Sequence, residues 1–293
     1  MPETTPHAMD TLDKRPGVAK PDPILVIDGV QRRFGGLKAV DVDHLEIQRG
    51  VITALIGPNG AGKTTFFNLL TGFDTPDEGR WIFEGDELGG VPSHKVARKG
   101  MVRTFQLTKA LSRLTVMDNM LLGATGQRGE RFLPALFRPG WSKQEEANRV
   151  RAEELLGRFK LLDKKDDYAG ELSGGQRKLL EMARALMVQP SLVMLDEPMA
   201  GVNPALVQSL LEHVTALRNE GMSVIFVEHD MDVVMGISDW VVVLAEGQVI
   251  AEGRPADIMS DRAVIDAYLG RSHDEPETDT STPAPDGPDR TEE

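Results

Sequence analysis

The sequence predicts an α/β protein with a largely parallel sheet, and three observations support that prediction. Apolar runs of strand length alternate with helix-like segments over most of the chain. The later runs are almost continuously apolar, which is typical of parallel strands covered on both faces. The composition, with 40% hydrophobic and 27% charged residues, is that of a globular protein. Alternating strands and helices indicate an α/β architecture.

Six apolar runs are candidate strands, separated by other segments of which several have helical periodicity. They are Ile24–Ile27, Ile52–Ile56, Trp81–Phe83, Leu192–Leu195, Val224–Val227 and Val241–Leu244. The segment from about residue 107 to 171 differs, because its amphipathic stretches are strongly charged and contain no convincing strand. We expect a helical insertion there.

The composition of the two ends differs from that of the middle. Residues 1–22 are rich in proline, threonine and charge, and residues 271–293 carry eight acidic and two basic residues, a net charge of −6. Segments of this composition bury too little apolar surface to fold. We therefore expect one folded domain over 23–270, between a disordered N-terminal tail and a disordered acidic C-terminal tail.

Charge and residue inventory exclude several classes of function. The net charge of −13 argues against general polyanion binding, so no nucleic-acid partner is expected. The absence of cysteine excludes disulfides, thiolate catalysis and cysteine-ligated metal centres. No apolar run approaches the roughly 20 residues that cross a bilayer, and the N-terminus lacks the apolar core of a secretory signal. We expect the chain to stay in the cytoplasm.

The segment after the second candidate strand has the spacing of a phosphate-binding loop. It matches G-x-x-x-x-G-K-[ST] and comes just before an apolar helix that starts at Thr65. Glycines let backbone N–H groups point inward at phosphate, the lysine adds a cation, and the threonine hydroxyl can ligate Mg²⁺. The candidate nucleotide-binding residues are Gly57, Pro58, Asn59, Gly60, Ala61, Gly62, Lys63, Thr64 and the following Thr65. A dinucleotide-binding turn is the alternative, but it requires another glycine spacing and leaves the Lys-Thr pair unexplained.

Two acids follow a strand that should lie inside the sheet. Asp196 and Glu197 come directly after Leu192–Leu195, and ligands of open α/β sheets bind at the carboxyl ends of strands. Asp196 is expected to hold the Mg²⁺ shell, and Glu197 to polarise the attacking water. Because adjacent strand residues point apart, the two acids can serve different partners. A solvated strand end is the plain alternative.

The sequence Leu-Ser-Gly-Gly-Gln opens an amphipathic helix. Ser173 and Gln176 form a capping box, which by itself predicts only a well-capped helix start. Gly174 and Gly175 are costly in a first turn, by about 1 kcal/mol each relative to alanine. They make most sense if a ligand approaches this backbone closely.

In this order, the phosphate loop, Leu-Ser-Gly-Gly-Gln and Leu-Asp-Glu-Pro resemble the ATP-binding subunits of ABC transporters, over about residues 24–270. The resemblance implies a P-loop NTPase with a RecA-like core, an antiparallel β subdomain and a helical subdomain. It implies ATP and Mg²⁺ as ligands, and ATP hydrolysis as the activity. It also implies a second ATPase subunit, identical or related. The helix start Ser173–Gln176 of this chain would complete the ATP-binding site of that second subunit.

Further positions are similar to functional residues of that family. Phe34 resembles the aromatic residue that stacks on adenine, and Gln106 the glutamine that reaches Mg²⁺ and senses the membrane partner. His229 resembles the switch histidine that contacts the γ phosphate. One position departs from the pattern, because Asn203 stands where many members carry aspartate.

Local segments around Phe34, Gln106 and His229 are similar to the ATP-binding subunits of branched-chain amino acid importers. That branch implies polytopic permease subunits, an extracytoplasmic substrate-binding protein acting indirectly, and a peripheral position on the cytoplasmic face of the cell membrane. Importers of urea or amides and exporters of lipopolysaccharide are alternatives, because they share many of these segments.

Two other classes are weighed against a transport subunit. A soluble ABC-type ATPase of DNA repair or translation would have a long coiled coil or, usually, a second cassette, and this sequence has neither. A catalytically inactive regulatory cassette would be expected to lack Glu197 or His229, and both are present.

Overall fold

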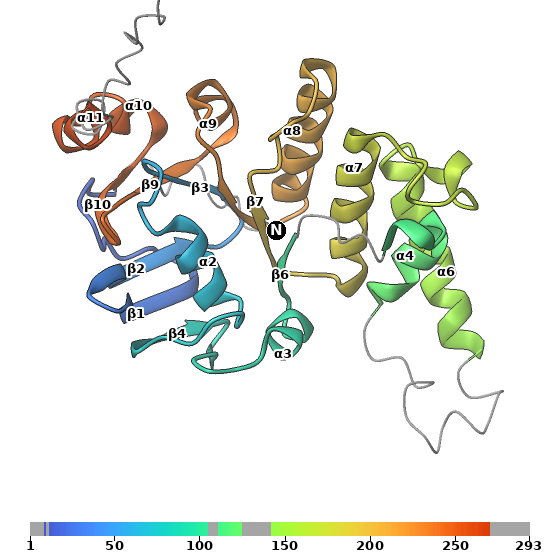
Figure 1. Cartoon of the computed structure of the whole chain (residues 1–293), viewed down its shortest axis with the longest axis horizontal. Coiled ribbons are helices and arrows are strands. Elements are labelled where there is room, and N and C mark those ends of the chain that lie inside the picture. Colours follow the sequence, from blue (N-terminus) through green and yellow to red (C-terminus); the bar gives the residue numbers. More distant parts are fainter. Residues whose placement is uncertain (1–8, 10–11, 105–110, 125–141, 270–293) are drawn as a thin grey trace, which may run out of the picture.

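A computed structural model describes residue 9 and residues 12–104, 111–124 and 142–269 (Figure 1). The strands are β1 (Pro23–Phe34), β2 (Leu37–Gln48), β3 (Ile52–Ile56), β4 (Glu78–Phe83), β5 (Asp86–Glu87), β6 (Met101–Arg103), β7 (Leu192–Asp196), β8 (Ser223–Val227), β9 (Trp240–Ala245) and β10 (Gln248–Gly253). The α-helices are α2 (Lys63–Leu70), α3 (Ser93–Arg98), α4 (Val116–Leu122), α6 (Ser142–Arg158), α7 (Gly174–Ala185), α8 (Pro204–Asn219), α9 (Met231–Ile237), α10 (Pro255–Ile258) and α11 (Arg262–Leu269). All six candidate strands are confirmed.

The central sheet has the order β10-β9-β3-β8-β7-β6, and only β10 pairs antiparallel among these described strands. Strands β3, β8 and β9 at its centre are buried at every position and are almost wholly apolar. In β8, Val224 and Phe226 belong to one buried cluster, whereas Ile225 and Val227 belong to the other. A strand whose two faces both pack in buried clusters has no polar face, which explains the continuous apolar runs in the sequence.

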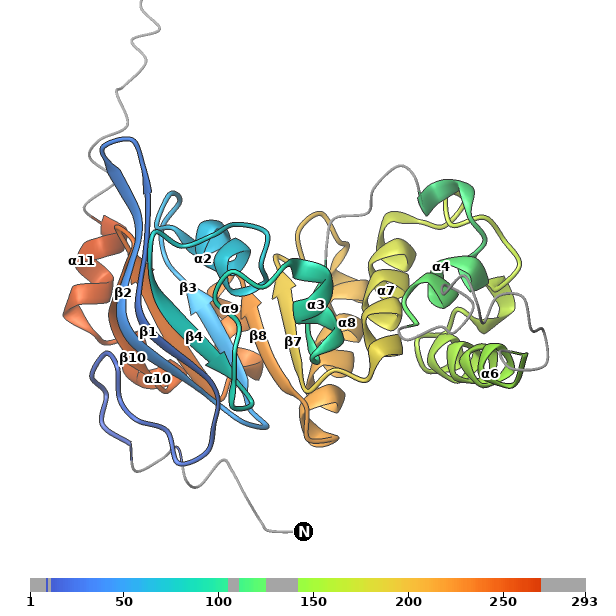
Figure 2. The ribbon, with the colours of Figure 1, turned by 90° about the horizontal axis from the view of Figure 1, so that it is seen from below.

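A second, antiparallel sheet has the order β2-β1-β4-β5. Phe66 and Phe67 of α2 share a buried cluster with Trp81 of β4 and Val242 of β9, so α2 packs between the two sheets. Figure 2 shows this sheet beside the central one. The antiparallel β subdomain and the α/β core that the family resemblance implied are therefore both present.

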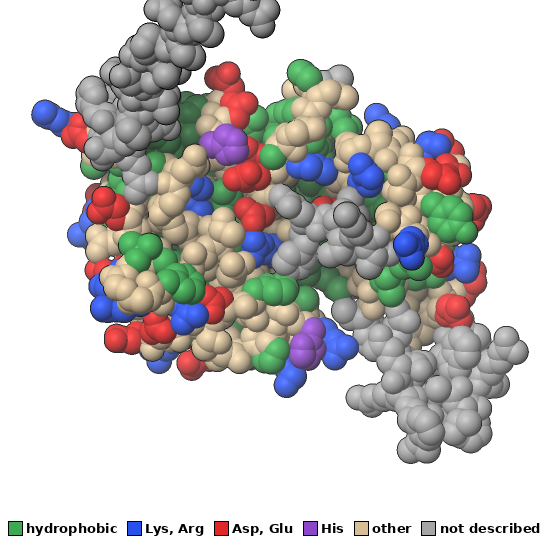
Figure 3. Space-filling model, viewed as in Figure 1, with side chains coloured by type: hydrophobic (Ala, Val, Ile, Leu, Met, Phe, Trp, Pro, Cys, Tyr) green, Lys and Arg blue, Asp and Glu red, His purple; other side chains and the backbone are tan. Residues whose placement is uncertain are grey.

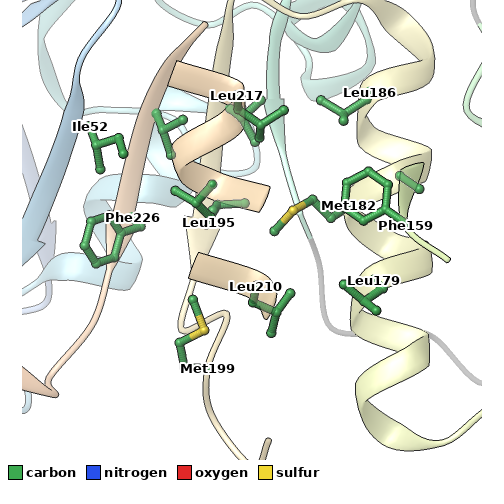
Figure 4. Close-up of a cluster of buried hydrophobic side chains, with 14 of the residues drawn as sticks. Ile52, Phe159, Leu179, Met182, Leu186, Leu195, Met199, Leu210, Leu217 and Phe226 are labelled. Carbon is green, nitrogen blue, oxygen red and sulfur yellow. The ribbon is translucent and has the colours of Figure 1, made fainter. Parts of the chain in front are cut away.

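Helices α4, α6 and α7 form a helical part, which lies on the other side of β7 from the antiparallel sheet in both Figure 1 and Figure 2. Helices α4 and α6 pack against α7. The cluster in Figure 4 joins Phe159, which directly follows α6, and Met182 of α7 to Leu195 of β7 and Leu210 of α8. The predicted helical insertion over 107–171 thus contains α4 and α6, and the helix that follows it, α7, packs on both of them and on the central sheet.

Part of the predicted N-terminal tail packs on the folded domain, because residues 12–22 contain buried contacts. The side chains of Lys20 and Glu252 are both 0% exposed and form an ion pair of 2.7 Å. Glu252 accepts two further hydrogen bonds, from the backbone N–H of Val18 and from Nε1 of Trp240. Burial lowers the pKa of Lys20, although Glu252 opposes that shift. Proline and charge in this segment suggested disorder, but one buried ion pair anchors it to β10.

Every described helix is too short or too polar to span a bilayer. On the face shown in Figure 3, acidic and basic side chains are interspersed. The predicted acidic tail over 271–293 lies outside the described residues.

The buried ion pair generates a stability prediction. Lys20→Met leaves the Glu252 carboxylate without its ammonium partner, so we expect the free energy of unfolding to fall by about 3–5 kcal/mol. Urea denaturation followed by circular dichroism measures the change. Lys14→Met is the matched control, because Lys14 is 58% exposed and pairs with Asp257 at the surface; its cost should not exceed about 1 kcal/mol. Equal losses in the two variants would contradict the anchoring role.

Candidate active site

Three parallel strands end side by side at one edge of the central sheet. In the strand register, Leu55 of β3 pairs with Val227 of β8, and Val227 pairs with Asp196 of β7. Adjacent strands are about 4.8 Å apart, so the chain segments that follow these strands emerge within roughly 10 Å of one another. The phosphate loop, Glu197 and His229 follow β3, β7 and β8 respectively. The sheet thus brings together three motifs that are far apart in the sequence.

The phosphate loop has a backbone that only glycine can supply at two positions. Gly57 has φ 152°, and a Cβ there would lie 2.0 Å from the carbonyl oxygen of Leu244. Gly62 has φ 100°, and a Cβ there would lie 2.2 Å from the carbonyl oxygen of Ala39. Neighbouring backbone therefore fixes the curl of the loop. This tight turn directs the start of α2 toward the loop's interior, as a phosphate site requires.

Lys63 and Thr64 lie at the first turn of α2. The Lys63 ammonium donates to the carbonyl oxygens of Gly57 (2.6 Å) and Pro58 (3.0 Å), so it lies over the loop. Thr64 is exposed at the helix start. A cation over a curled loop and an adjacent hydroxyl form a donor set that fits the phosphates of ATP and a Mg²⁺ ion.

Asp196 is paired to Arg103, a residue that the sequence analysis did not single out. Arg103 ends β6; one of its guanidinium nitrogens donates to Asp196 and another to Oδ1 of Asn68 in α2 (2.6 Å). Its side chain is only 7% exposed. Arg103 therefore ties the strand end that carries the acid to the helix that carries Lys63. The sequence signal was faint, because a lone arginine is usually a solvated surface charge.

The strand alternation predicted for Asp196 and Glu197 does not extend to Glu197. Strand alternation was expected to turn the two acids apart, but β7 ends at Asp196 and Glu197 has φ 46°. A left-handed backbone costs a non-glycine residue about 1–2 kcal/mol. Oε1 of Glu197 lies 3.9 Å from Nδ1 of His229, and both side chains are about half exposed or more. Glu197 and His229 thus face each other at the accessible edge of the sheet.

The loop after Glu197 is held by two charged side chains that the sequence analysis missed. Lys178 of α7 donates to the carbonyl oxygens of Glu197 (3.2 Å) and Pro198 (3.0 Å). Glu228, next to His229, accepts from the backbone N–H of Met199 (2.9 Å). Burial lowers the pKa of Lys178 and raises the pKa of Glu228.

Phe34 lies at the end of β1, exposed over 50% of its surface. The guanidinium of Arg32 lies 4.8 Å from the centroid of its ring and is itself paired with Asp74 and Asp77. One aromatic face thus meets a cation, and the ring keeps enough exposed surface to stack on a base.

The predicted capping box at α7 is present, with Ser173 and Gln176 bonded reciprocally. A Cβ at Gly174 would point into open space, so that position leaves its backbone approachable. Gly175 has a packing reason, because a Cβ there would lie 1.6 Å from the side chain of Leu206. The expectation that a ligand explains both glycines is therefore too broad.

The helix start lies near Glu197 of its own chain, but away from the phosphate loop. Gly174 and Glu197 line one cavity of about 250 Å³, and its described lining contains no residue of the loop 57–62. Figures 1 and 2 show α2 and α7 on opposite sides of β7. Gln106, the remaining predicted site residue, lies outside the described residues.

This geometry is that of a nucleotide-hydrolysing cassette, and comparison with known proteins gives the same class. Residues 40–200 match the family described as ABC transporter, and residues 248–274 match the family described as branched-chain amino acid ATP-binding cassette transporter. Over 252 residues the chain is 42% identical to the probable branched-chain amino acid transport ATP-binding protein LivG of Archaeoglobus fulgidus, covering 86% of this chain and 97% of that protein. It is 41% identical to the high-affinity branched-chain amino acid transport ATP-binding protein BraF of Pseudomonas aeruginosa, covering 85% and 99%.

Solved structures agree. A nucleotide-free ATP-binding cassette from an ABC transporter has a TM-score of 0.74 and 38% identity, covering 84% of this chain and 98% of that one. The ADP conformation of an ATP-binding cassette has a TM-score of 0.73 and 38% identity, covering 85% and 99%. The chain belongs to the ABC transporter family. It is a nucleotide-binding ATPase subunit of a transport system, which confirms the predicted fold class, family and activity.

Proposed function

We propose that this subunit powers the import of branched-chain amino acids by hydrolysing ATP at a site that a second subunit completes. The common edge of β3, β7 and β8 carries the proposal, because it gathers the phosphate loop, the paired acids and His229. Both relatives described above are named as branched-chain amino acid transport proteins, and the family match over 248–274 carries the same description.

The residues take distinct roles toward ATP. The phosphate loop from Gly57 to Gly62 surrounds the phosphates with backbone N–H groups, Lys63 neutralises their charge, and Phe34 stacks on the base. Glu197 accepts a hydrogen bond from the attacking water, and His229 donates to the γ phosphate. Within a nucleotide site of this kind Thr64, Gln106 and Asp196 would hold Mg²⁺, which offsets phosphate charge when bound.

Ser173–Gln176 acts on the nucleotide of a facing subunit. The capped helix start is separated from its own phosphate loop by the central sheet, yet Gly174 leaves backbone open to a ligand. Backbone N–H groups at a helix N-terminus favour an anion such as the γ phosphate. Two ATP molecules would then lie between two subunits, identical or related, and closure of the pair would move the permease.

A cleft of about 440 Å³ supports permease docking next to the helical part. It is lined by residues of α3, β6 and α7, and by the exposed apolar side chains of Phe73 and Leu122. Thr104 also lines it, two residues before Gln106. We place the subunit on the cytoplasmic face of the membrane, with its permease held at this cleft.

Two substitutions at the nucleotide site should have different effects. Lys63→Ala removes the cation over the phosphate loop, so ATP affinity should fall about 10- to 100-fold. Glu197→Gln keeps ATP binding but should lower turnover about 10²- to 10⁴-fold, because the amide is a poor general base. Fluorescent-nucleotide titration and phosphate release measure the two quantities. Exposed Lys95→Ala and Glu87→Gln serve as controls. Wild-type turnover in Glu197→Gln would contradict the role of Glu197.

Variants at the helix start test the facing pair. Ser173→Ala and Gly174→Asp should lower ATP hydrolysis about 100-fold, as expected when a donor to developing charge is lost. ATP binding by a single subunit, measured at low protein concentration, should stay within about 2-fold of wild type, as for the exposed control Gly157→Asp. Loss of single-subunit binding would show that this helix serves its own nucleotide and refute the facing arrangement.

Uptake measurements test the cargo. A deletion strain should lose uptake of labelled leucine and valine and keep uptake of labelled urea, and the wild-type chain should restore the loss. A strain carrying Glu197→Gln should remain defective, because hydrolysis powers the import. Loss of urea uptake alone would identify the system as a urea importer instead.

A further inference from the structure

The backbone at Glu197 adopts a conformation that it would not choose by itself. Its φ of 46° is in the left-handed region, where a side chain other than glycine is unfavourable. Such conformations persist only when surrounding contacts impose them. The contacts that reach this loop therefore determine where the Glu197 carboxylate points.

Lys178 bonds to two carbonyl oxygens on the side of α7. Its ammonium lies 3.2 Å from the carbonyl oxygen of Glu197 and 3.0 Å from that of Pro198. Both acceptors are backbone atoms, so the contact depends on the path of the chain and is independent of the Glu197 carboxylate. Because α7 packs in the buried core through Leu179, Leu180 and Met182, Lys178 extends from a fixed support.

Glu228 holds the same loop from the side of β8. It is 2% exposed, and its Oε1 accepts from the backbone N–H of Met199 at 2.9 Å. The next residue in the chain is His229, whose ring faces Glu197. A buried carboxyl oxygen bonded to a backbone N–H cannot be replaced by water without opening the core, so the contact is strongly maintained.

We propose that Lys178 and Glu228 are positioning residues for ATP hydrolysis, which together hold residues 197–199 so that the Glu197 carboxylate faces His229. We call these three hydrogen bonds the base clamp. The proposal rests on the proposed role of Glu197. Since the clamp bonds go only to backbone atoms of the loop, the clamp affects turnover through Glu197 and leaves nucleotide affinity alone.

The test compares variants that remove the clamp with variants that keep it. Lys178→Met and Glu228→Leu should lower kcat about 10- to 100-fold, the cost of a misplaced catalytic group, with the Kd for ATP unchanged within about 2-fold. Lys178→Arg keeps a donor and Glu228→Gln keeps the acceptor oxygen, so both should retain most of the activity. Lys143→Met, at an exposed position on α6, is the control for loss of a lysine charge. Urea denaturation confirms that each variant is folded, and Lys178→Met is informative even if Glu228→Leu does not fold.

A second background separates positioning from a general structural effect. In Glu197→Gln, where the carboxylate is already absent, adding Lys178→Met should lower kcat no further, because the clamp acts through that carboxylate. A full additional loss in this background would overturn the proposal, as would wild-type kcat in Lys178→Met alone. Wild-type turnover in Glu197→Gln by itself would instead refute the proposed function, so the two failures are distinguishable.

Discussion

The parallel register of β3, β8 and β7 is the constraint on which the site depends. Leu55, Val227 and Asp196 lie in one row across three strands, so the segments that follow them emerge at a common edge. A shift of a single strand by one residue would turn its side chains to the other face and exchange its two cores. The side chains of Val224–Val227 alternate between the two buried clusters, and packing on both faces opposes such a shift. The strand register that packs the two cores is therefore also the register that brings the site residues together.

Much of this arrangement could be predicted from the sequence, because its signals are local. The runs that became β7, β8 and β9 are apolar without interruption, the run that became β3 is interrupted only by Thr53, and the glycine spacing of the phosphate loop is specific. The alternating strand β2 was missed, since Val40 and Val42 are separated by a partly exposed Asp41 and the run reads as polar. Short β6 offered only three residues. The length and the apolar character of a run are the signals used to recognise a strand, and both are weak for short edge strands and for half-exposed strands.

The residues missed at the site share a different property, which is that their partners are distant in the sequence. Arg103 and Asp196 are separated by 93 positions, and Glu228 reaches Met199 across 29. The same is true of Lys20 and Glu252, which lie 232 positions apart and convert a predicted tail into a packed segment. Nothing in the residues next to Lys20 or Glu228 distinguishes them from solvated charges. Only the fold shows that each charge is buried against a specific partner.

Ser173 caps the start of helix α7, and Lys178 lies five residues later within the same helix. If Ser173 contacts the nucleotide bound by the facing subunit while Lys178 holds the Glu197 loop of its own subunit, helix α7 connects the two nucleotide sites. If ATP at one site changes the ATP affinity of the other site through this helix, then ATP at the other site must change the affinity of the first by the same factor. This follows because the coupling free energy between two sites is reciprocal. Cooperativity between the two nucleotides would in that case need no extra domain, because a single helix in each subunit is sufficient to transmit it.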